Sequence, residues 1–117
     1  MPNPIPIIQG TLLTASVATF FTVGVNDPKV KQVILTSVRF VNTDSVAHTF
    51  TMYIVPAGAS ASDANCRFKT FAIPAAGDPD SSQYFVMSDV ILPGTRIQAL
   101  ADVASKVAIS ANGVSAP

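Results

Sequence analysis

Residues 29–56, KVKQVILTSVRFVNTDSVAHTFTMYIVP, carry the alternation of apolar and polar side chains that most constrains the fold. A period of two is typical of a β-strand with one buried face. The odd positions are mostly polar, with Val33, Leu35 and Val55 as exceptions. The even positions, which we expect to face the core, are Val30, Ile34, Val38, Phe40, Val46, Phe50, Met52 and Ile54.

A turn signal, Asn-Thr-Asp-Ser at residues 42–45, separates the two alternating runs, so the pattern predicts an antiparallel hairpin. Directly opposed residues of a hairpin share a face, and joining even to even positions therefore requires an odd number of loop residues. A three-residue loop would place Ile34 opposite Ile54, Val38 opposite Phe50 and Phe40 opposite His48.

Further short strands follow, separated by turns that contain proline, glycine or aspartate. Residues 66–73 alternate strictly, which predicts Phe68 on one face of a strand and Phe71 with Ile73 on the other. Residues 83–87 form a short strand, and residues 96–100 and 106–110 a last strand pair. The spacing predicts an all-β fold, a single antiparallel β-sandwich, and leaves open a jelly roll or an immunoglobulin-like Greek key.

The N-terminal segment, residues 1–9, alternates proline with other residues, and Pro2, Pro4 and Pro6 bias it toward an extended form. One interpretation is a disordered tail. The other is an extended Pro-rich N-terminal arm on a neighbouring subunit, since ordering an already extended segment costs little entropy. We therefore divide the chain into an arm, 1–9, and a β-sandwich domain, 10–117. The arm residues expected at the interface are Pro4, Ile5, Ile7 and Ile8.

Charge is scarce. Charged residues make up 12% of the chain, all seven acids are aspartate, and the formal net charge is +0. A nucleic-acid partner is not expected, because binding phosphates requires a basic surface. A membrane partner is not expected either, since no apolar run is long enough to span a bilayer. Low charge indicates either an outer face covered by other subunits or simply a low-charge monomer.

No residue pattern points to an enzyme, a cofactor or a metal. His48 is the single histidine, without a Cys, Asp or Glu at ligand spacing, and we expect a residue at the rim of the sandwich. Cys66 is the single cysteine and is expected to act as a small hydrophobe. Asp78 and Asp80 flank Pro79 in a turn that lacks the six or more ordered oxygens of a calcium loop.

The segment YIVPAGASASDAN, residues 53–65, resembles small β-sandwich proteins from the structural genes of tailed bacteriophages. In these a "Val-Pro-small-Gly" turn precedes a Ser/Ala/Asp/Asn loop, and a "Leu-x-x-Gly-Asp-x-Ile-x-Ala" step follows later. Residues 92–99, LPGTRIQA, and 109–114, ISANGV, complete the likeness over residues 31–114. The sequence departs at Thr95 and Arg96, where the pattern has Asp after the glycine.

The resemblance implies a non-enzymatic virion protein, and two functions from it stay open. The first is a capsid decoration (cement) protein, a homo-oligomer expected to be a trimer that binds the major capsid protein. The second is a tail or neck component, such as a fibre, adaptor or collar subunit. A third candidate, a host-glycan-binding module, is disfavoured by the absence of Trp. On the hairpin, the interface is expected on the polar odd face, at Arg39, Thr51 and Tyr53.

Overall fold

The structure is a computed structural model that describes residues 3–24 and 32–116. Within these residues the fold consists of eight strands and two short 3-10 turns. Two of the residues discussed above, Pro2 and Val30, lie outside the described part. The strands are β1 Asn3–Leu12, β2 Ala18–Thr22, β3 Gln32–Asn42, β4 His48–Val55, β5 Cys66–Ile73, β6 Ser82–Ile91, β7 Arg96–Ala101 and β8 Val107–Ala116. The turns are η1 Asp63–Asn65 and η2 Pro79–Ser81.

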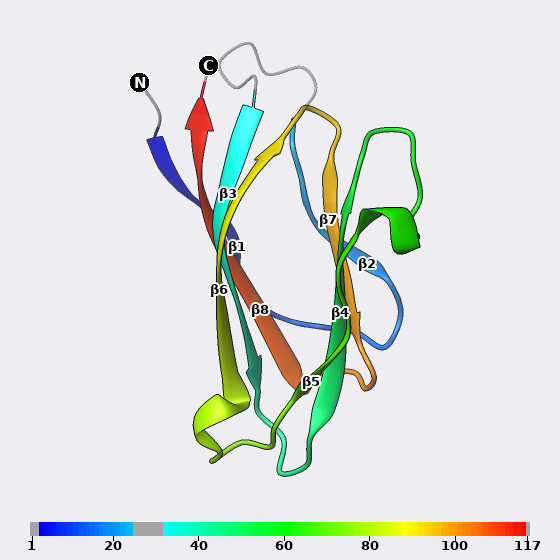
Figure 1. Cartoon of the computed structure of the whole chain (residues 1–117), viewed down its shortest axis with the longest axis vertical. Helices are drawn as coiled ribbons and strands as arrows, with labels where there is room; N and C mark the ends of the chain where they lie inside the picture. Colours follow the sequence, from blue (N-terminus) through cyan, green and yellow to red (C-terminus); the bar gives the residue numbers. More distant parts are fainter. Residues whose placement is uncertain (1–2, 25–31, 117) are drawn as a thin grey trace.

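Two antiparallel four-stranded sheets pack face to face, which confirms the predicted β-sandwich (Figure 1). Sheet A has the order β1-β8-β3-β6, and sheet B has the order β2-β7-β4-β5. This is the strand order of a jelly roll. In an immunoglobulin-like sandwich the first two strands pair within one sheet, whereas here β1 and β2 belong to different sheets. The topology therefore decides between the two predicted alternatives.

The predicted hairpin of residues 29–56 is wrong in its pairing. β3 pairs with β6 and β8 in sheet A, while β4 pairs with β5 and β7 in sheet B. Instead of facing Val38, as predicted, Phe50 stacks on Phe40 across the sandwich, with ring centroids 3.8 Å apart and an angle of 15° between the planes. The predicted last pair fails in the same way, because β7 and β8 also belong to different sheets. Alternation identifies the buried face of each strand. It does not tell whether two such strands are neighbours in one sheet or lie in opposite sheets of a sandwich.

A β-bulge in β3 changes which of its residues face the core. The pairing register shifts between Leu35 and Ser37 on both sides of the strand, and Ser37 and Val38 are buried in succession. Before the bulge the odd residues Val33 and Leu35 are buried, and Ile34, expected in the core, is only half-buried. An extra residue in one strand of a pair reverses the inside–outside alternation beyond it.

A second bulge explains the aromatic residues of β5. Thr70 has φ 48°, and the pairing with β4 shifts there, from Phe71 opposite Phe50 to Phe68 opposite Met52. The hydroxyl of Thr51 accepts a hydrogen bond of 3.0 Å from the Thr70 amide. Phe68 and Phe71 therefore both pack on the core, 6.1 Å apart, instead of on opposite faces as predicted.

The predicted N-terminal arm is also corrected, because its described part, residues 3–9, belongs to β1. Pro4 and Pro6 lie opposite Val114 and Asn112 of β8, and Ile7 and Ile8 are buried in the core of the same chain. Prolines two residues apart turn their nitrogens to the same side of a strand, here the unpaired edge, so they remove no hydrogen bond from the ladder. The domain boundary between residues 9 and 10 thus falls inside a strand.

Gly113 of β8 gives a test of this placement of β1. A Cβ on Gly113 would collide with the Ile34 carbonyl oxygen and with Cδ1 of Ile7, whereas a Cβ on Gly10 would meet no atom within 4 Å. We expect Gly113→Ala to lower the free energy of unfolding by about 2 kcal/mol, the usual cost of overpacking. Gly10→Ala is the matched control and should leave stability unchanged or slightly raised. Urea denaturation measures both, and equal stability of the two variants would contradict the close packing of β1, β8 and β3.

Candidate interaction surface

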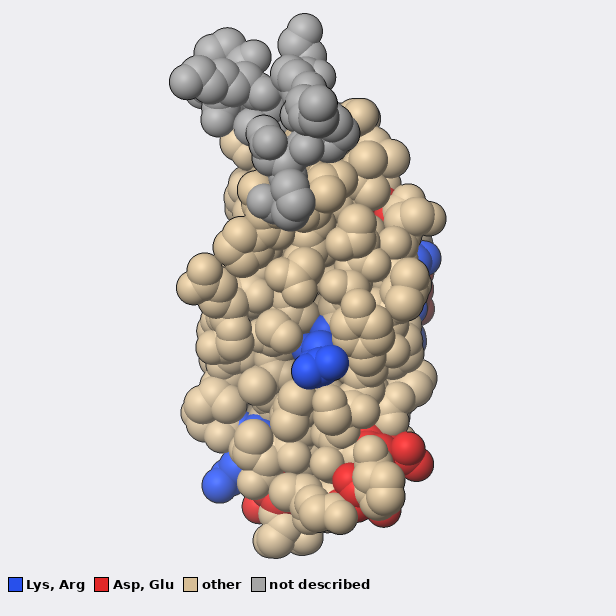
Figure 2. Space-filling view, turned by 90° about the vertical axis from the view of Figure 1, so that its left-hand side faces the viewer, with Lys and Arg blue, Asp and Glu red and all other residues tan. Residues whose placement is uncertain are grey.

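The outer face of sheet A is almost free of charge. Its four strands contain two charged residues, Arg39 on β3 and Asp89 on β6. Asp89 is turned toward β5, where Arg67 binds it, so Arg39 is the one charged side chain that these strands present outward. Figure 2 shows this face, with a cluster of basic atoms near its centre and further basic and acidic atoms near its lower end. Few charged groups on this face would have to lose their hydration in a contact, so the face is suited to contact with another protein.

An apolar ridge runs along β6, on the edge of this face. Tyr84, Val86 and Val90 alternate with inward residues and are 55%, 82% and 54% exposed. The Arg39 guanidinium lies 5.3 Å from the centroid of the Tyr84 ring, a cation–π distance. The sequence did not reveal this ridge, because the inward residues Phe85 and Met87 are apolar too and the alternation between apolar and polar residues is lost.

A shallow hollow of about 390 Å³ lies on the same face, over β1, β8 and β3. It is lined by Ile5, Pro6, Thr36, Asn112, Gly113 and Val114. Its floor is held by the Thr36 hydroxyl, which donates a hydrogen bond of 3.1 Å to the Asn112 carbonyl. The ridge and the hollow give the face an uneven shape, and a specific protein contact needs a shape that its partner can complement.

The residues predicted for the interface do not gather on one surface. Arg39 lies on the outer face of sheet A, while Thr51 and Tyr53 lie on β4 in sheet B and are half-buried. Ile7 and Ile8 are buried in the core of their own chain and cannot contact a neighbouring subunit. The described residues that remain available on sheet A are Arg39 and Pro6, whereas Ile5 is partly buried and packs against the core, although it also lines the hollow.

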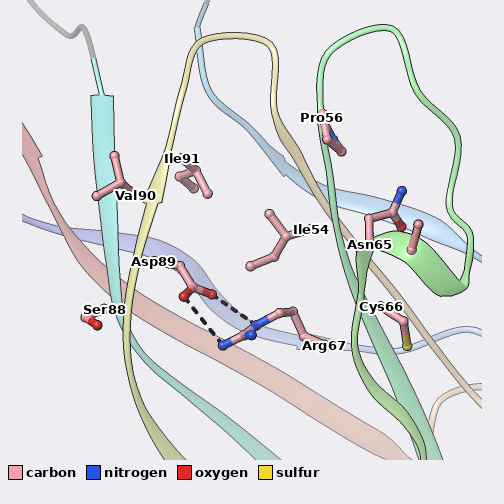
Figure 3. Close-up of a pocket in the computed structure, with 10 residues that line it drawn as sticks. Ile54, Pro56, Asn65, Cys66, Arg67, Ser88, Asp89, Val90 and Ile91 are labelled. Carbon is pink, nitrogen blue, oxygen red and sulfur yellow. Dashed lines mark hydrogen bonds and ion pairs between the residues drawn. The ribbon is translucent and has the colours of Figure 1, made fainter.

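A second hollow, of about 500 Å³, opens between β5 and β6 at one edge of the sandwich (Figure 3). Arg67 and Asp89 pair in it, with Nε 3.0 Å from Oδ2 and Nη2 3.5 Å from Oδ1. Cys66 lines the hollow as well, and Figure 3 shows its sulfur turned away from this ion pair. Neighbouring residues of a strand point to opposite sides, so the thiol is not placed against the charged groups of Arg67 and Asp89. The pair ties the two sheets together rather than activating a nucleophile.

His48 is buried and lies at the centre of a partly exposed ion-pair cluster, at the end where β4 begins. Its Nε2 lies 2.7 Å from Oδ2 of Asp44, and its Nδ1 lies 3.0 Å from Oδ1 of Asp102. The hydrogen bond to Asp44, aided by Asp102 and opposed by burial, raises the pKa of His48 above its ordinary value of 6.5. The hydrogen bond from His48 likewise lowers the pKa of Asp44 below 3.8. The two carboxylates occupy opposite ring nitrogens, so the imidazole joins the β3–β4 loop to the β7–β8 loop.

His48 was expected to lie at the rim with no acidic neighbour, and this expectation is wrong about the neighbours. Asp44 is four residues before it in the loop, and Asp102 is distant in sequence. A single metal ion could not bind one ring nitrogen and both carboxylates in this arrangement. Within residues 3–24 and 32–116 no set of three His, Cys, Asp or Glu side chains has the geometry to hold a metal. The same part of the chain contains no helix that could cross a membrane.

The comparisons with known proteins identify a fold, not a family. No family model matches the chain, and no curated protein matches it. A chain in the structure of infectious bursal disease virus, Gx strain, is similar over 99% of this chain, with a TM-score of 0.51 and 11% sequence identity. The match covers 32% of that longer viral chain. At this identity the likeness supports the jelly-roll fold alone.

The His48 cluster predicts a pH dependence of stability. A pKa raised on folding contributes stability that is fully present below pH 6.5 and is lost as pH rises through the folded-state value. The lowered pKa of Asp44 contributes above pH 3.8 and is lost as pH falls through its own folded-state value. We therefore expect the thermal midpoint to fall as pH rises above 6.5, and the fall to be much smaller in His48→Gln.

The charged groups that surround His48 at this end of the sandwich are Asp44, Asp102 and Lys106, and Lys106 lies near Asp44. The measurement is thermal unfolding at intervals from pH 5 to 9, with the imidazole pKa followed by NMR. An imidazole pKa at or below 6.5, or the same pH profile in His48→Gln, would contradict the cluster.

Proposed function

We propose that the protein is a structural component of a virus particle, and specifically a decoration protein that binds the outside of an assembled capsid. The observation that carries the proposal is the outer face of sheet A, with one outward charge and an apolar ridge on which Val86 is 82% exposed. Jelly rolls occur in viral capsid domains, and the similar chain named above comes from a virus structure.

The partner that fits this face is a protein surface, the major capsid protein, rather than a nucleic acid. A surface that binds phosphates needs several cations. Sheet A presents Arg39 alone, and the described cations of β5 are already paired, Arg67 with Asp89 and Lys69 with Asp63. An uncharged face is inexpensive to desolvate, and a single central arginine suits the core of a protein interface, where arginine and tyrosine are enriched.

Binding of this kind stabilises a shell by mass action. A protein that binds the assembled shell and not its dissociated subunits adds a stabilisation that grows with its free concentration relative to Kd. No chemical step is required. The polar groups that could take part in one, His48 and the Arg67–Asp89 pair, are held in ion pairs that connect strands and loops.

Copy number tests the proposed location. In particles of the virus that encodes the chain, we expect quantitative mass spectrometry to find hundreds of copies per particle, in a fixed ratio to the major capsid protein. Purified protein added to shells that lack it should bind and raise their thermal midpoint. Six or twelve copies per particle would contradict a decoration role and support a tail or neck component. Binding to a glycan array without binding to shells would contradict both.

Arg39→Ala tests whether sheet A is the contact face. Arg39 is exposed and makes no ion pair with a described residue, so its removal should leave the fold intact. If the face is buried on the shell, we expect the affinity for shells to fall at least about tenfold. Lys106→Ala removes one exposed cation from the β7–β8 loop instead and is the matched control. Equal affinity of the two variants would exclude this face as the contact.

A further inference from the structure

Strand β6 ends sheet A with an unpaired edge. Eight of its ten residues, Ser82–Ile91, pair with β3 on one side, and the strand pairs with no described residue on the other. The strand contains no Pro, Gly, Lys or Arg, and its single charged residue, Asp89, is held by Arg67. Unpaired amide and carbonyl groups along a strand are a template for another strand, which proteins ordinarily block.

The other three edges are blocked in the ways expected of a monomer. β1 carries Pro4 and Pro6 and two register shifts, and β2 is five residues long with a shift of its own. β5 carries Arg67, Lys69 and the bulge at Thr70. Proline, short length, cationic side chains and bulges all hinder the addition of a strand. β6 carries one register shift as well, between Val86 and Asp89, but its regular part, residues 82–86, has neither proline nor a charged side chain and is left available.

We propose that β6 pairs with β6 of a second copy of the chain, antiparallel and about a two-fold axis perpendicular to the sheet. The two sheets A would then form one continuous sheet of eight strands, with the apolar ridges of both copies side by side on the same outer face. A two-fold contact requires that the surface match itself. A strand edge does so in its backbone hydrogen bonds, and the side chains of this strand carry no charge that opposes itself.

The register follows from the regular part of the strand. The pairing with β3 is uninterrupted over residues 82–86 and shifts once beyond Val86, so the two-fold axis is best placed at Tyr84. Tyr84 then faces Tyr84 of the second copy, and Ser82 faces Val86. Neither copy has a charged residue within the paired stretch 82–86. The two Arg39 side chains are three strand spacings apart, roughly 14 Å, beyond the screening length of about 8 Å at physiological salt.

The proposal is independent of any binding to a capsid and is tested on the purified protein. Sedimentation equilibrium at increasing concentration should give a monomer–dimer equilibrium. Tyr84→Glu places two carboxylates opposite each other across the axis, while Arg39 beside it pairs with the new charge within each copy. We expect this variant to remain folded and its dimer Kd to rise at least about tenfold. Val46→Glu, a charge at an equally exposed loop position (55%), is the control and should leave Kd unchanged.

Cross-linking tests the axis itself. In a Cys66→Ser background, Tyr84→Cys should form a disulfide-linked dimer on mild oxidation, because directly opposed strand residues lie within disulfide reach. Val46→Cys in the same background is the control and should cross-link far less. A monomer at every concentration, a trimer, or a dimer that Tyr84→Glu leaves unchanged would overturn the proposal. So would cross-linking of Val46→Cys as readily as Tyr84→Cys.

Discussion

The contact between Phe40 and Phe50 holds the two sheets together, and much of the remaining architecture serves it. The rings stack at 3.8 Å, one from each sheet, and both side chains are fully buried. Phe68, Phe71 and Phe85 surround the pair, and Phe68 and Phe85 lie 4.3 Å apart across the edge of the sandwich. Aromatic pairs add roughly 1 kcal/mol each beyond the burial of their area, so this cluster determines how the sheets face each other.

The turn between β3 and β4 is shaped to permit that stack. Asn42 is buried at the end of β3, and its side-chain amide donates to the carbonyls of Val46 and Pro74, at 2.9 and 3.0 Å. Its side-chain oxygen accepts a hydrogen bond from the Asp44 amide. Both the NH2 group and the oxygen of the buried Asn42 side chain are hydrogen-bonded, and these bonds fix the path of the chain from one sheet to the other. Leaving the side chain unpaired would cost about 1–3 kcal/mol. Alternation in the sequence identified the strands on either side of this turn but not the crossing.

Local pattern therefore predicted the strands and the sandwich, whereas pairing, bulges and the contact surface depended on distant residues. Each of β3 and β4 buries one side of the strand whether the two strands adjoin or oppose each other, so periodicity could not separate a hairpin from a jelly roll. The bulge at Thr70 requires the hydroxyl of Thr51 on another strand. Pro4 and Pro6 suggested an arm because proline is excluded from central strands, although an edge strand accepts it when the nitrogens face outward. The acidic partner Asp102 of His48 is likewise invisible in a local window.

The fold shows where the few charged residues of the chain lie. Among the described residues, most charged groups lie at the loop end around His48 and along the β5 edge, where they pair. Charge confined to these regions is available for solubility and for ties between strands, and it leaves the outer face of sheet A apolar and polar but nearly neutral. A monomer would gain from a charge on the β6 edge, as on β5, since Lys there discourages strand addition. The neutral ridge on β6 is the surface that the two proposed contacts, with a shell on this face and with a second copy at this edge, would cover.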